Sequence, residues 1–166
     1  MTYVRYWAVG FVLIVLQTTF FYHIAPLRGI YDLLVPLVIS IGYRRSLREG
    51  LMLTLVIGLA ADSVAGSPFG LYLTSYVWIC LGVYQTKGVL EVSNFLILAA
   101  ACVICVLFQN LVLIIATLIT YAQNPFSFAS LGAIGLQLIW VLITGPPLFF
   151  IFSRIAPGAD EPGYAQ

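Results

Sequence analysis

Charged side chains are scarce in this sequence. The 166 residues include seven Lys and Arg and six Asp and Glu, so charged residues make up 8% of the chain, against roughly 25% in globular domains. Apolar residues make up 62%, and the mean hydropathy is +1.07. So few charges cannot cover the surface of a soluble domain of this length. The composition therefore predicts an integral membrane protein with almost no soluble part.

Residues that carry out chemistry are also scarce. One His and three Cys leave little for a metal centre, and a net charge of +1 argues against nucleic acid as a partner. The sequence contains no H-E-x-x-H, paired-carboxylate, G-x-S-x-G or phosphate-loop pattern. Cys102 and Cys105 have C-x-x-C spacing, but an apolar setting suppresses the reactive thiolate and no further zinc ligands lie nearby. We expect no enzyme activity and no cofactor.

Six apolar runs follow one another along the chain. Since a spanning helix needs about 20 apolar residues, we expect an all-α polytopic membrane protein with about six transmembrane helices. Residues 1–156 are expected to form a single helical domain, and residues 157–166 a short disordered tail. The first run is too long for the core of a signal peptide, so its helix is expected to be retained. The runs cover residues 4–22, 30–43, 50–65, 69–86, 92–121 and 131–155.

Two of these runs have irregular features. The second has about 14 residues, about 21 Å as a helix, which is short for a hydrocarbon core of about 30 Å. It also contains Pro36, so we expect a short, broken second helix that is tilted or partly buried. The sixth run contains Gly145-Pro146-Pro147, where we expect a kink.

Basic residues gather on one side of the predicted topology. With the helices taken in order, one side receives six basic residues and the other receives only Arg28. The positive-inside rule makes the first side cytoplasmic, with both termini inside. The loop that holds three of the arginines could also meet anionic lipid head groups or a cytoplasmic partner. The six residues are Arg5, Arg44, Arg45, Arg48, Lys87 and Arg154.

Asp62 is an acid within an apolar run. It lies twelve residues after Gly50, about 18 Å along the third helix, in the outer half of the membrane, where an acid is costly. Two interpretations are open: an ion, proton or substrate site, or a structural acid that caps Ser63, Gly66 or a neighbouring helix end. Asp32, at the start of the second helix, is expected to complement the dipole of that helix.

Small residues form a stripe along the same third helix. They fall within an arc of about 80°, and such a stripe lets a second helix approach closely. Packing inside the chain and a docking face for a partner protein both remain open. The stripe consists of Gly50, Thr54, Gly58, Ala61 and Ala65.

Amide side chains lie within the last two runs. Gln109 and Asn110 are adjacent in the fifth, and Gln137 lies in the sixth. Amides in lipid commonly hydrogen-bond between helices, but together with Asp62 these three could instead line a polar pocket.

The stretch from Asp32 to Tyr76 resembles the MreD family of bacterial rod-shape-determining membrane proteins. In that family a Pro-Asp or Pro-Asn pair opens the short second helix, whereas Tyr31 precedes Asp32 here. A basic loop then ends at a glycine, and a pattern of Gly, Asp and Gly-Ser-Pro-x-Gly crosses the third helix and its turn. The matching residues are Asp32, Gly50, Gly58, Asp62, Gly66, Ser67, Pro68 and Gly70.

The resemblance implies a non-enzymatic scaffold in the cell-elongation machinery that inserts lateral peptidoglycan at the bacterial inner membrane. The implied partner is MreC, a bitopic protein with an extracytoplasmic domain. Indirect partners would be MreB filaments, the RodA glycosyltransferase and a class B penicillin-binding transpeptidase. The family is related in fold to the substrate-binding subunits of energy-coupling-factor transporters, so a transport subunit with a small-molecule pocket is the alternative.

Overall fold

Helices account for all of the regular secondary structure that the computed structural model describes, over residues 2–16, 32–65, 70–88, 90, 94–121 and 128–155. This confirms the all-α prediction. Two of the helices, α5 and α6, contain segments long and apolar enough to cross a membrane, at Phe95–Ala116 and Ile134–Phe152. The six helices are α1 (Thr2–Val15), α2 (Leu34–Arg44), α3 (Leu47–Ala65), α4 (Leu71–Gln85), α5 (Phe95–Tyr121) and α6 (Phe128–Ile155).

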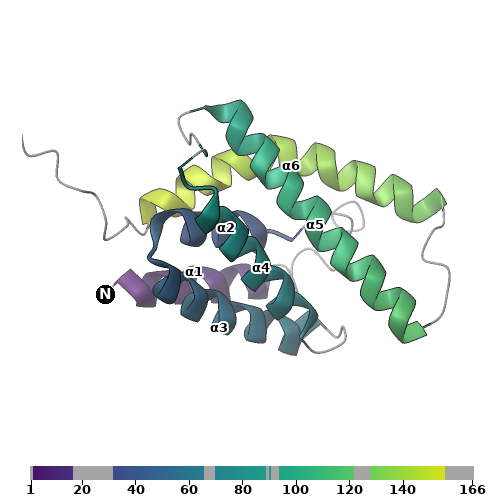
Figure 1. Ribbon diagram of the computed structural model, residues 1–166, viewed down its shortest axis with the longest axis horizontal. Helices are drawn as coiled ribbons and strands as arrows, with labels where there is room; N and C mark the ends of the chain where they lie inside the picture. Colours follow the sequence, from purple (N-terminus) through teal and green to yellow (C-terminus); the bar gives the residue numbers. More distant parts are fainter. Residues whose placement is uncertain are drawn as a thin grey trace, which may run out of the picture.

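The short helix α2 lies at the centre of the bundle. It contacts each of the other five helices, with α1 and α3 on one side of it and α6 on the other (Figure 1). Every residue from Leu34 to Gly42 is buried. A helix that is apolar on all sides is either a membrane span that faces lipid or a core helix buried by its neighbours, and α2 has neighbours on all sides. Eleven residues span only about 16 Å, but neighbouring helices rather than lipid cover this helix.

The predicted break in α2 is wrong for residues 34–44. The helix is continuous over this range, and Pro36 is its third residue. Backbone N–H groups in the first turn of a helix have no partner within the helix, so a proline there costs no hydrogen bond. In α6 the helical assignment continues through Pro146 and Pro147, and the ribbon bends in its middle part (Figure 1).

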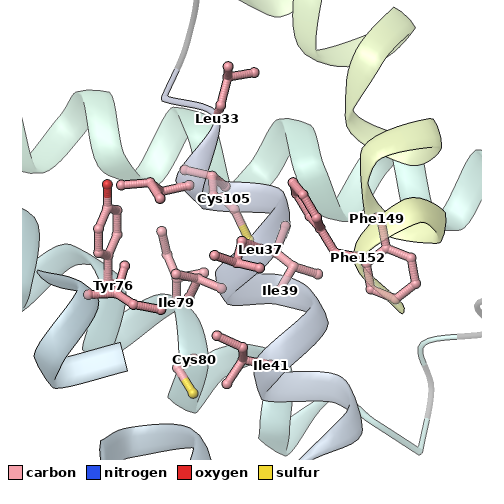
Figure 2. Packing of buried hydrophobic residues seen from close by; sticks show 14 of the residues in the cluster. Leu33, Leu37, Ile39, Ile41, Tyr76, Ile79, Cys80, Cys105, Phe149 and Phe152 are labelled. Carbon is pink, nitrogen blue, oxygen red and sulfur yellow. The ribbon is translucent and has the colours of Figure 1, made fainter. Parts of the chain in front are cut away.

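Side chains from the other five helices meet around α2 to form the core. Figure 2 shows Leu37, Ile39 and Ile41 of α2 between side chains of α4 and α6. Tyr76 of α4 and Phe149 of α6 are both fully buried. The other labelled members of this cluster are Leu33, Ile79, Cys80, Cys105 and Phe152.

Helices α5 and α6 pack as an antiparallel pair with a four-residue repeat. A Cβ placed on Gly145 would lie 3.2 Å from the Cβ of Cys102, and Asn110 hydrogen-bonds Gln137. Between these two contacts, Val106 and Val141 are buried at the matching positions. Packing of i±4 ridges makes two helices cross at about 50°. The end of α5 and the start of α6 therefore lie apart (Figure 1).

The two ends of the bundle carry opposite charge. The start of α2, the end of α3 and the start of α4 lie at one end (Figure 1), called here the aspartate end because Asp32 and Asp62 lie there. The other end, called the basic end, carries Arg44, Arg45, Arg48 and Lys87.

Candidate functional site at the aspartate end

Asp62 of α3 caps the first turn of α4. Its Oδ2 accepts hydrogen bonds from the backbone N–H groups of Gly70 and Leu73, each at 3.1 Å, and its Oδ1 accepts one from Tyr72 at 2.9 Å. The start of a helix leaves N–H groups without partners and carries a partial positive charge. A carboxylate there accepts hydrogen bonds from these N–H groups, and its negative charge is attracted to the positive end of the helix. Asp62 is 4% exposed. Of the two interpretations of this residue, the hydrogen bonds correspond to capping of a neighbouring helix end.

Gly70 makes this cap possible. Its φ is +98°, in the left-handed region that a side chain disfavours. This backbone turn directs the N–H groups of residues 70, 72 and 73 toward the end of α3. The cap therefore depends on a glycine from the predicted Gly-Ser-Pro-x-Gly motif. Gly66, Ser67 and Pro68 of that motif lie outside the described residues.

Asp32 joins three helices. Its Oδ1 accepts a hydrogen bond from the backbone N–H of Leu34 at 3.0 Å, which caps α2 as its position predicts. Its Oδ2 accepts two more, from the hydroxyl of Tyr76 on α4 and, at 2.9 Å, from Nε2 of Gln109 on α5. Asp32 thereby connects the start of α2 to both α4 and α5.

Two tyrosines at the aspartate end, Tyr72 and Tyr76, were not among the residues that the sequence predicted for a site. The Tyr76 side chain is fully buried, and its ring lies 5.9 Å from that of Tyr72 between centroids. The two residues are four positions apart, so they share one face of α4. Two tyrosines four residues apart in an apolar helix could have indicated a polar contact on one face of α4. Their spacing does not predict that the partner is Asp32, 44 residues away in the sequence.

The four residues of the predicted polar pocket do not form one hydrogen-bonded group among the described residues. Asp62 binds the start of α4 and Gln109 binds Asp32. Asn110 donates instead to Oε1 of Gln137 at 3.1 Å and to the backbone oxygen of Val106 at 2.9 Å. Adjacent residues on a helix point about 100° apart, so Gln109 and Asn110 reach different partners. These amides connect helices, which was the other interpretation.

The small-residue stripe faces α4. A Cβ on Gly58 would lie 2.7 Å from Cα of Leu73, and one on Gly50 would lie 3.4 Å from Sγ of Cys80. Thr54 between them is fully buried, and Ala61 is 7% exposed. The backbones of α3 and α4 approach closely because these positions are small. With α4 on this face, a partner helix cannot dock on the stripe, so that interpretation needs correction.

Polar contacts also join the helices at the basic end. Arg45 and Glu49 form an ion pair at 3.6 Å, and the Arg45 side chain is 3% exposed. Nζ of Lys87 donates a hydrogen bond to the backbone oxygen of Arg45 at 2.7 Å, which ties the end of α4 to the α2–α3 turn. Arg48 is exposed.

Metal and thiol chemistry find little support in the part of the chain that the structure describes. No group of three His, Cys, Asp or Glu side chains gathers there. Cys80, Cys102 and Cys105 are free and buried.

Comparison with protein families gives a match over most of the chain. The family model of the rod shape-determining protein MreD matches residues 2–155, which is nearly the whole chain. The chain belongs to the MreD family. No curated protein and no solved structure matches it, so the kinship with energy-coupling-factor subunits remains a prediction.

MreD membership confirms the resemblance that the glycine and aspartate pattern indicated. MreD proteins are membrane proteins of the rod-shape machinery and are not enzymes, in agreement with the scarcity of catalytic residues. At the aspartate end of this MreD chain, Asp32 and Asp62 accept six hydrogen bonds between them. Both aspartates therefore connect helices of the bundle through hydrogen bonds.

Proposed function

We propose that this chain is a non-enzymatic scaffold of the bacterial cell-elongation machinery in the inner membrane. In this role it docks the transmembrane helix of MreC and so supports lateral peptidoglycan synthesis. Through MreC it would be linked to MreB filaments, RodA and a class B penicillin-binding transpeptidase. Family membership supports the role in rod shape, and exposed apolar residues at the end of α5 and the start of α6 support the docking.

The docking proposal rests on two glycines near the start of α6 that no described residue covers. Gly132 and Gly135 have no described atom within 4 Å of where a Cβ would lie. They are three positions apart, so they share one face of α6. Small residues on a helix face allow a second transmembrane helix to come close. This short face, unlike the stripe on α3, is not occupied by any part of the chain that the structure describes.

The surrounding surface is apolar and lightly packed. No described residue of α5 after Gln109 is buried, and none of α6 before Val141. Leu111, Leu136 and Ile139 are among the exposed apolar residues here. A partner helix between or beside these two helix ends would bury apolar surface that the bundle leaves uncovered. We call this surface, from Leu111 on α5 and up to Ile139 on α6, the α5–α6 arms.

The predicted orientation places the arms on the extracytoplasmic side. The basic end faces the cytoplasm by the positive-inside rule, and the end of α5 and the start of α6 lie at the opposite end (Figure 1). A helix docked on the arms would emerge beside its own extracytoplasmic domain, which is where a bitopic partner such as MreC carries its mass.

Bulky substitutions at open glycines test this docking. We expect the double variant Gly132→Leu/Gly135→Leu to recover roughly tenfold less co-expressed MreC from detergent extracts, because the added side chains keep a partner helix away from α6. The matched control is Gly82→Leu, since Gly82 on α4 is exposed and a Cβ added there would also meet no described atom within 4 Å. It should recover as much MreC as the wild type.

Two results would count against the proposal. If the double variant retained full MreC recovery, the arms would not be the docking surface. If the wild type recovered no MreC, the scaffold role itself would fail.

A further inference from the structure

The outward face of α3 combines a cation with an apolar track. Arg48, Met52, Leu55 and Leu59 are all exposed, Met52 by 71%. Their spacing of four, three and four residues keeps them within an arc of about 60°, centred about 130° around the helix from the small-residue stripe. The face that does not pack on α4 therefore begins with a positive charge at the basic end and continues with apolar side chains.

The length of this track matches one leaflet of a bilayer. Eleven residues separate Arg48 from Leu59, about 16 Å along a helix. Half of a hydrocarbon core of about 30 Å is about 15 Å. With Arg48 at the head-group boundary, Met52, Leu55 and Leu59 follow the path of one acyl chain to the middle of the membrane.

Three arginines lie near the start of this track in the sequence, at positions 44, 45 and 48. Glu49, the acid in the first turn of α3, pairs with Arg45. Neither Arg44 nor Arg48 has an acidic partner among the described residues, and Nε of Arg44 is buried with no hydrogen-bond partner there. The start of α3, a 19-residue helix, adds the positive end of its dipole at the same place. The local charge is thus complementary to a phosphate group.

We propose that the start of α3 binds one anionic phospholipid of the cytoplasmic leaflet. Its phosphate lies against Arg44, Arg48 and the first turn of α3, and one acyl chain lies along Met52, Leu55 and Leu59. Charge complementarity at the helix start and the leaflet-length track together favour a lipid over a free anion. This site is separate from the α5–α6 arms and does not depend on the docking of a protein partner.

Native mass spectrometry of the detergent-solubilised full chain, titrated with phosphatidylglycerol or phosphatidylcholine, tests the site. We expect one phosphatidylglycerol to bind in a saturable way and in preference to phosphatidylcholine. Arg48→Gln should weaken this binding about fivefold, and Arg44→Gln/Arg48→Gln about 25-fold, since each removes one basic contact with an anionic head group. Thermal unfolding of each variant verifies that the bundle is intact.

Arg154→Gln is the matched control. Arg154 is exposed in the last turn of α6, and α6 lies across α2 from α3 (Figure 1). This substitution removes the same charge at the same end of the bundle and should leave phosphatidylglycerol binding unchanged.

Three results would overturn the proposal. The first is equal binding of the two lipids. The second is a loss in Arg154→Gln as large as that in Arg48→Gln, which would indicate diffuse attraction to net charge. The third is displacement of phosphatidylglycerol by an equal concentration of inorganic phosphate, which would indicate an anion site without a lipid track.

Discussion

At the scale of single residues, every carboxylate oxygen of Asp32 and Asp62 accepts at least one hydrogen bond. An acid in an apolar helix demands an explanation because it is costly there, so the sequence alone could single out Asp62 and offer capping as one explanation. It could not identify the capped helix, because the cap joins residues 8 to 11 positions apart across a turn. For Asp32, the start of α2 was predictable, whereas Tyr76 and Gln109 were not.

Substitution of Asp62 should separate its hydrogen bonds from its charge. Asp62→Asn keeps one acceptor oxygen and should lower the free energy of unfolding by about 1 kcal/mol. Asp62→Leu leaves three N–H groups at the start of α4 without that acceptor and should lower it by about 3 kcal/mol or more. Denaturant titration in mixed micelles measures both. Equal tolerance of Asn and Leu would show that the cap does not stabilise the fold.

At the scale of helices, the sequence predicted the existence of the elements better than their neighbours. Each of the six apolar runs contains a helix, because long apolar segments in lipid must satisfy their backbone hydrogen bonds internally. The break expected in α2 was wrong because Pro36 falls in the first turn. The small-residue stripe indicated close approach of some helix, but its spacing cannot distinguish α4 from a second protein.

The contact between α3 and α4 should tolerate no added carbon at Gly58. Gly58→Ala places a Cβ 2.7 Å from Cα of Leu73, a backbone atom that cannot move alone. We expect the free energy of unfolding to fall by about 2–3 kcal/mol, in the upper part of the usual range for overpacking. Gly82→Ala is the control, because its Cβ enters open space, and it should be neutral or raise stability by up to about 1 kcal/mol. Equal behaviour of the two variants in micelle unfolding would contradict the close packing.

At the scale of the whole molecule, a short central helix organises the bundle. The composition predicted a membrane protein and the basic residues predicted its orientation, because both properties are sums over the chain. The central place of α2 was not predictable in this way. It depends on contacts with five other helices, and the links from Asp32 to Tyr76 and Gln109 cross 44 and 77 residues of sequence. No periodic pattern in one segment records such distant pairings.

Cysteine labelling tests the predicted orientation. Ser46 is exposed in the α2–α3 turn at the basic end, and the three native cysteines are buried, so Ser46→Cys should provide the main reactive thiol. We expect a membrane-impermeant maleimide to label it in inverted membrane vesicles and to leave it unlabelled in intact spheroplasts. The reverse pattern would place the basic end outside and would also exclude the proposed position of the arms.

The α5–α6 pair has a stiff part, where the two helices are in close contact, and a more deformable part toward the end of α5 and the start of α6. From the Gly145–Cys102 contact to the Asn110–Gln137 hydrogen bond, close-packed side chains resist any change in the spacing of the two helices, since close-packed interiors deform little. Beyond that bond the helices can spread or close with small loss of contact. Force applied at the end of α5 and the start of α6 would then change the angle between the two helices about the Asn110–Gln137 contact. The helix α2 and the residues packed around it would stay in place.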